Sequence, residues 1–134
     1  MKYEWYSPTT GAPIVSIAEY GITFNIGAIE IMGKPKYVML GYDEEEHLIG
    51  VKPCDENKEN RMEFYKKFRN KYIRLANKDF IRFLKSRIRE DIKIEDKAKR
   101  YVAKWDKEEK ILYIDLNNQI GANKKNKSEK IENL

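Results

Sequence analysis

Lysine and arginine recur at helical spacing between residues 78 and 89. Steps of four, three and four residues place four of these cations on one face of a predicted helix. Two further cations precede them on a predicted strand over residues 71–76. A row of cations one helical turn apart can meet successive phosphates of a nucleic acid and release the counterions bound there. The candidate phosphate-binding residues are Lys71, Arg74, Lys78, Arg82, Lys85 and Arg89.

The charge of the chain is unevenly spread. Its 134 residues carry a net charge of +5, yet residues 13–54 hold three lysines against six acidic residues. Residues 66–89 hold ten lysines and arginines with a single acidic residue, Asp79. This asymmetry favours a partner with an acidic surface, and DNA is the first candidate. A solvated face that only keeps the protein soluble has the same pattern, and so does a face that binds an acidic protein.

Other kinds of chemistry find little support in the sequence. His47 is the single histidine and Cys54 the single cysteine, so neither a zinc site nor a catalytic triad can be assembled. The acidic run at 43–46 lacks the spaced oxygen ligands and the glycine of a calcium loop, and is typical of a charged hairpin turn. The seven glycines form no phosphate-binding loop. We therefore expect a non-enzymatic protein with no catalytic residue, no metal and no cofactor.

Four aromatic residues on predicted hairpins could stack on the bases of a single-stranded nucleic acid. They fall at matching positions of an internal repeat, which favours packing in a shared core over an exposed stacking surface. These residues are Tyr37, Tyr42, Tyr101 and Trp105.

The elements that must position these residues occur twice. Residues 37–51 and 101–114 both read Tyr-Val, then an aromatic-Asp pair, a charged turn and an apolar run, at offsets of 64 and 63 residues. Four apolar residues that begin at Ile22 precede four others that begin at Ile73 by 51 residues. Internal repeats decide architecture, and this one predicts two strand–helix–hairpin units that share one core. The predicted fold class is α+β, mostly β.

Apolar alternation and capping residues define the elements of each unit. Asn25 and Asn77 are candidate helix N-caps, and Gly33 is a candidate helix stop. Residues 62–69 fit either a strand with a bulge or a short helix, and the repeat favours the strand. The first unit is predicted to contain strands at 13–19 and 22–26, a helix at 27–32 and a hairpin at 36–42 and 47–52. The second is predicted to contain strands at 62–69 and 71–76, a helix at 78–89 and a hairpin at 99–105 and 110–116.

The two units account for most of the chain. No apolar run approaches the roughly eighteen residues of a membrane span, and the first residues show no signal-peptide pattern. We expect a cytoplasmic protein without membrane contact, either a monomer or a homodimer. The predicted segments are a lead-in at 1–12, a first β–α–β–β unit at 13–54, a second at 55–116 with an insertion at 90–98, and a polar, mobile tail at 117–134.

The order of these elements resembles the AbrB/MraZ/SpoVT swapped-hairpin family. The resemblance implies a double-split β-barrel with pseudo-twofold symmetry, in which two β–α–β–β units of one chain interlock. It also implies a DNA-binding transcription regulator or an antitoxin. The residues that carry it are Ile14–Ile17, Gly21–Phe24, Ile29–Gly33, Tyr37–Val38 and Asp43–Pro53.

The first unit departs from this family at the positions that contact DNA. The family has a basic residue after the turn glycine and paired arginines on the helix, where this chain has Ile22, and Glu30 with Ile31. The second unit has cations in the equivalent places, so we predict that DNA is bound through its basic strand–helix face. Two alternatives stay open: a protein–protein interaction module, antitoxin-like or a mobile-element accessory protein, and a fold that has lost DNA binding.

Overall fold

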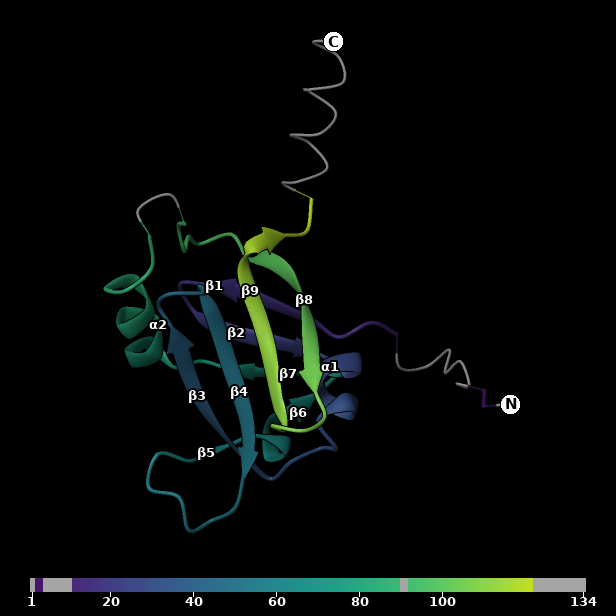
Figure 1. Cartoon of the computed structure of the whole chain (residues 1–134). Coiled ribbons are helices and arrows are strands. Elements are labelled where there is room, and N and C mark those ends of the chain that lie inside the picture. The colour runs from purple at the N-terminus through teal and green to yellow at the C-terminus, as the bar shows by residue number, and fades with distance from the viewer. Residues whose placement is uncertain (1, 4–10, 90–91, 122–134) are drawn as a thin grey trace.

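The computed structural model describes residues 2–3, 11–89 and 92–121, which form one antiparallel sheet with two short helices (Figure 1). The sheet has nine strands in the order β5-β3-β4-β9-β8-β1-β2-β7-β6. The expectation of an α+β, mostly β fold is confirmed. In chain order the elements are β1 (Ile14–Ala18), β2 (Gly21–Asn25), α1 (Ile26–Ile31), β3 (Tyr37–Asp43), β4 (Leu48–Cys54), β5 (Met62–Glu63), the 3-10 helix η1 (Tyr65–Lys67), β6 (Phe68–Arg69), β7 (Tyr72–Leu75), α2 (Lys78–Lys85), β8 (Lys99–Asp106) and β9 (Ile111–Gln119).

The hydrophobic core lies between two layers of this curled sheet. Figure 1 shows β3, β4, β9 and β8 in one layer, with β1, β2 and β7 crossing behind it. Strand alternation sends every second side chain inward, so that Val15 is fully buried and Ser16 beside it is partly exposed. The buried cluster joins Phe24 of one layer to Ile49 and Ile114 of the other. Removing these apolar side chains from water stabilises the curled arrangement.

Both helices begin at an asparagine cap, as predicted. The Oδ1 atoms of Asn25 and Asn77 each accept a hydrogen bond, at 2.9 Å, from the backbone N–H three residues further on. Asn25 also accepts from the N–H of Ile14 at 2.9 Å, which ties the start of α1 to β1. After α1 the chain turns at Gly33, with φ of 84°. The two helices lie at opposite ends of the sheet layers, with α2 at the left and α1 at the right of the view (Figure 1).

The β3–β4 and β8–β9 hairpins turn in the same way. Asp43 accepts hydrogen bonds from the N–H groups two and three residues on, at 3.0 and 3.2 Å. Asp106 does the same at 2.9 and 3.0 Å. A left-handed residue then completes each turn, His47 with φ of 59° and Lys110 with φ of 56°. The acidic run at 43–46 is therefore a hairpin turn, as predicted.

Both edges of the sheet come from one short segment. β5 pairs with β3 at one edge and β6 pairs with β7 at the other. Only Phe64 and η1 separate these two edge strands, so the sheet has to curl back on itself. The prediction of a strand over 62–69 is correct at its two ends and wrong in its middle, where the chain makes a 3-10 turn.

Two element ends differ from the prediction by three residues or more. α2 ends at Lys85, four residues before the expected end, because Ser86 caps it. β9 extends to Gln119, so the first three residues of the expected tail belong to a strand. Residues 1, 4–10, 90–91 and 122–134 of the expected lead-in, insertion and tail lie outside the described residues. In the described ranges no helix has the length and apolar character needed to cross a membrane.

Candidate nucleic-acid interface

A row of polar side chains crosses four neighbouring strands on the outer face of the sheet. The pairing registers place Arg100 of β8 opposite Ser16 of β1, and Ser16 opposite Thr23 of β2. Thr23 in turn lies opposite Arg74 of β7. Ser16, Thr23 and Arg74 each lie between two buried residues of their strand, and Arg100 precedes the buried Tyr101, so the four side chains face away from the core. Three strand spacings separate the two arginines, a span of about 14 Å.

The same outer surface carries a further arginine and two tyrosines. Arg69 of β6 pairs with Tyr72 of β7 in the row next to Arg74. The strands β1, β2, β6 and β7, and the part of β8 that pairs with β1, contain no aspartate or glutamate. An anion that approaches this surface therefore meets no carboxylate from these strands. We call the surface the arginine face; its residues are Ser16, Tyr20, Thr23, Arg69, Tyr72, Arg74 and Arg100.

Arg74 is held against the sheet by two aromatic rings. Its Cζ lies 4.7 Å from the ring centroid of Tyr20 and 5.6 Å from that of Tyr72. Its Nε also donates a hydrogen bond to Oγ1 of Thr23, at 3.4 Å. Tyr20 is 37% exposed and lies in the turn between β1 and β2. Cation–π contacts of this kind restrict the guanidinium group while leaving it accessible from solvent.

The cations of α2 are less available than the sequence indicates. Nη2 of Arg82 lies 3.1 Å from Oδ1 of Asp79, and Nζ of Lys85 lies 3.0 Å from Oε1 of Glu19. Both pairs are solvent-exposed and weak, but each brings a negative charge next to the cation. Among the residues that the structure describes, the predicted cations that form no ion pair are Lys71, Arg74 and Lys78.

Lys85 sits at the edge of a small carboxylate cluster. A hydrogen bond from Asp96 lowers the pKa of Glu19, and the ammonium group of Lys85 lowers it further. The same hydrogen bond raises the pKa of Asp96. Glu19 thus keeps its negative charge beside Lys85, which makes this lysine a poor phosphate ligand.

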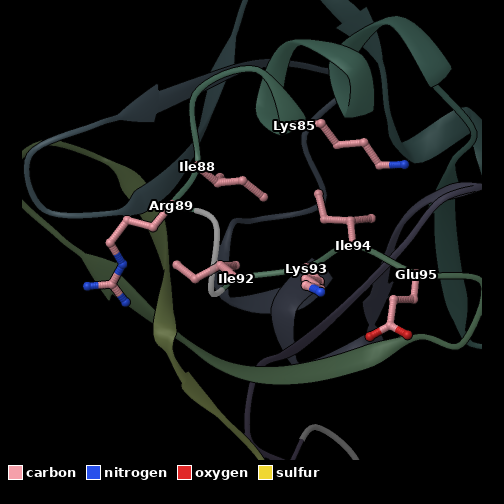
Figure 2. A pocket seen from close by; sticks show the side chains of 7 residues that line it. All are labelled: Lys85, Ile88, Arg89, Ile92, Lys93, Ile94 and Glu95. Carbon is pink, nitrogen blue, oxygen red and sulfur yellow. The ribbon is translucent and has the colours of Figure 1, made fainter.

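Arg89 lies beyond the end of α2, so the prediction that four cations share one helical face is wrong for this residue. Its Nη2 donates to Oδ1 of Asn117 on β9 at 2.6 Å. Figure 2 shows Arg89 and Lys85 on opposite sides of an open pocket of about 370 Å³, with their charged groups pointing away from one another. The side chains between them are apolar: Ile88, Ile92 and Ile94. In this arrangement the two cations cannot bind the same phosphate group.

The hairpin aromatics pack as the repeat predicted. Tyr101 is 3% exposed and belongs to the core, and Tyr42 and Trp105 pack against it. Burial raises the pKa of Tyr101, and burial together with the charge of Glu44 raises that of Tyr42. Tyr37 is half-buried, with the guanidinium group of Arg61 at 5.5 Å from its ring centroid. The preference for core packing is confirmed for Tyr42, Tyr101 and Trp105.

Comparisons with known proteins assign the chain to no family. No protein-family model matches it, and neither a curated protein nor a solved structure does. The resemblance to the AbrB/MraZ/SpoVT family therefore stays a prediction.

Sequence reasoning missed Arg69, Arg100 and Tyr20 as parts of the arginine face. Arg100 reaches the arginine face only because β8 pairs with β1, a strand more than 80 residues earlier. One signal was present in the sequence: β1, β2, β6 and β7 contain no acidic residue, which can be seen without knowledge of their pairing.

The single histidine and the single cysteine lie at opposite ends of β4. Nδ1 of His47 is 3.2 Å from the hydroxyl oxygen of Tyr42, while Cys54 is the last residue of the strand. No cluster of three histidine, cysteine, aspartate or glutamate side chains in the described ranges could hold a metal ion.

The Cys54 thiol is expected to react slowly. Burial raises its pKa, and the neighbouring charge of Asp55 raises it further. A raised pKa leaves less thiolate near neutral pH, and the thiolate is the reactive form. We expect Ellman's reagent to modify the folded protein several-fold more slowly than the protein unfolded in urea. The Asp55→Asn variant should react faster than the parent protein when folded, and an unchanged rate would contradict the role of Asp55.

Proposed function

We propose that the chain consists of two β–α–β–β units related by a pseudo-twofold axis, as in a swapped-hairpin barrel. The pairing of β2 with β7 supports this arrangement. Ile22 lies opposite Leu75, and Phe24 lies opposite Ile73. The offset of the apolar repeat is 51 residues. Adding 51 to the first residue of one pair, and subtracting 51 from its partner, gives the other pair. Two strands that pair about a twofold axis have this property.

The second hairpin layer supports the same symmetry. In the pairing of β4 with β9, Ile49 lies opposite Ile114, and Val51 lies opposite Leu112. The offset of the hairpin repeat is 63 residues, and adding it to one partner while subtracting it from the other turns the first pair into the second. The matching turns at Asp43–His47 and Asp106–Lys110 obey the same offset.

We propose that the protein binds DNA through the arginine face and acts by binding rather than by catalysis. The observation that carries this proposal is the grouping of Arg69, Arg74 and Arg100 on β6, β7 and the part of β8 that pairs with β1, none of which contains an acidic residue. Guanidinium groups bind phosphate through paired N–H donors and are over-represented where phosphates are recognised. The hydroxyl groups of Ser16 and Thr23, between the arginines, can donate to phosphate or sugar oxygens. The proposed binding surface is therefore the arginine face of the sheet, whereas the sequence predicted the basic strand–helix face of the second unit.

Charge reversal tests the proposal. The double variant Arg74→Glu, Arg100→Glu is expected to lower the affinity for DNA by about tenfold or more at low salt, because two phosphate contacts become repulsive. Affinity is measured by fluorescence anisotropy with a labelled oligonucleotide at about 50 mM and about 200 mM salt. The slope of log affinity against log salt should fall by about two, one for each lost contact.

A matched variant on α2 controls for net charge. Lys78→Glu, Arg82→Glu changes the net charge by the same amount on exposed residues away from the sheet face. We expect this variant to retain most of the affinity. A loss confined to the α2 variant would transfer the site to the helix. Absence of salt-dependent binding by the parent protein would refute the proposed function altogether.

A protein-interaction role is the second candidate, and the edge of β3 favours it. β5 pairs with β3 only at Tyr37 and Val38. Residues 39–43 have β4 on one side and, among the described residues, no strand on the other. An extended segment of a partner can add to such an edge through backbone hydrogen bonds. In this case the arginine face would contact an acidic protein, and the DNA titration would show no saturable binding.

A further inference from the structure

We infer that the nucleic acid bound by the arginine face is single-stranded, with bases stacked on Tyr20, Arg74 and Tyr72; this inference rests on the proposed function. Arg74 lies within cation–π distance of both rings, 4.7 Å from Tyr20 and 5.6 Å from Tyr72. The three side chains therefore form one partly exposed cluster beside β2 and β7. Tyr20 is 37% exposed, so its ring is accessible to a base.

The chemistry of this cluster selects unpaired bases. Every base has a π face that stacks on an aromatic ring or on a guanidinium plane, so the interaction tolerates any sequence. In a duplex both faces of each base are already stacked on neighbouring bases. Sheet surfaces with exposed aromatic residues accordingly bind single strands whose bases can be splayed out. Phosphates of the same strand would lie toward Arg69 and Arg100, on either side of the cluster.

The shape of the face argues against a duplex. Proteins that read double-stranded DNA place a helix or a two-stranded ribbon into the major groove. The arginine face instead presents the outer face of a curled sheet, with the short side chains of Ser16 and Thr23 between Arg74 and Arg100. Of the two α-helices that the structure describes, the basic one is α2, and it has two of its cations next to carboxylates, as described above.

A comparison of oligonucleotides tests the inference. A labelled oligodeoxythymidine of about twenty nucleotides is titrated beside a duplex of the same length, both by fluorescence anisotropy at low salt. We expect the single strand to bind at least about tenfold more tightly. Equal or tighter binding of the duplex would overturn the inference and leave the proposed function standing, whereas absence of binding to either probe would overturn both. An oligouridine of equal length separates DNA from RNA, because tighter binding of uridine would point to a 2′-hydroxyl contact and would overturn the assignment to DNA.

Removal of the rings identifies the stacking site. The double variant Tyr20→Ala, Tyr72→Ala is expected to lower the affinity for the single strand by about tenfold or more, because each ring stacks on one base. Duplex affinity should fall much less than single-strand affinity, since phosphate contacts use the guanidinium groups and not the faces of the rings. Tyr113→Ala, on the outer side of the other sheet layer, is the matched control and should leave both affinities unaltered. Circular dichroism verifies that each variant is folded, and a folded double variant with full single-strand affinity would refute the stacking geometry.

Discussion

Replacement of Phe64 by alanine is expected to destabilise the fold by about 3–5 kcal/mol. Phe64 is fully buried and joins the two edge strands β5 and β6. Its ring packs edge-to-face on Phe24, with centroids 5.0 Å apart and ring planes at 85°. Alanine would leave a cavity at the point where the chain passes from one edge strand of the sheet to the other. Guanidinium-induced unfolding measures the loss, which is a large part of the total stability of a domain of this size.

Phe83→Ala is the matched control, because it removes the same ring from the surface. Phe83 is 37% exposed, stacks on Phe80 at 5.8 Å, and lies 4.0 Å from the guanidinium carbon of Arg87. We expect a loss of about 1 kcal/mol or less. Equal losses in the two variants would contradict the position of Phe64 between the layers.

The elements that sequence predicted well are those that depend on neighbours within a few residues. An asparagine cap bonds to the N–H three positions away, and the aspartates of the two hairpin turns bond two and three positions away. Gly33 turns the chain after α1 because its φ of 84° suits a residue without a side chain. Interactions of this range leave a readable pattern in the order of the residues.

The register of the internal repeat does not give the inward face of α2, for a reason that can be located. The apolar repeat at 51 residues pairs Ile29 with Phe80, whereas the two capping asparagines lie 52 residues apart. One extra residue before a helix rotates its faces by about 100°. The structure accordingly buries Ile81 and Leu84, while Phe83 is exposed. The repeat identified the element, and its register alone could not identify the face.

The arginine face was beyond the reach of local pattern because it depends on long-range pairing. The repeat predicted two similar units but not which strands of one unit pair with those of the other. β1 pairs with β8, and β2 pairs with β7, which brings Arg100 and Arg74 to one surface. The helical row that sequence favoured ends early at Lys85, next to Glu19. A row of like charges is visible in a sequence, whereas the carboxylates that face it from other elements are not.

Gly21→Ala is expected to destabilise the protein by about 3 kcal/mol or more, from strain at positive φ together with overpacking. Gly21 begins β2 at φ of 143°, a conformation that residues with a side chain rarely adopt. An added Cβ would lie 2.2 Å from the carbonyl oxygen of Leu75, a backbone atom of the neighbouring strand β7. β2 and β7 would have to separate, and Tyr20 would then move away from Arg74. Chemical denaturation gives the loss of stability, and the anisotropy titration is expected to show weaker binding of the single strand.

Two other glycines separate backbone strain from collision. Gly33 also has a positive φ, 84°, but no atom lies within 4 Å of an added Cβ, so Gly33→Ala should cost about 1–2 kcal/mol from strain alone. Gly41 on β3 has neither a positive φ nor a near neighbour, and Gly41→Ala should change stability by about 0.5 kcal/mol or less. The expected loss of stability is smallest for Gly41→Ala, intermediate for Gly33→Ala and largest for Gly21→Ala. An equal loss at Gly33 and Gly21 would mean that strain alone acts at Gly21, and it would contradict the close approach of β2 and β7 on which the arginine face depends.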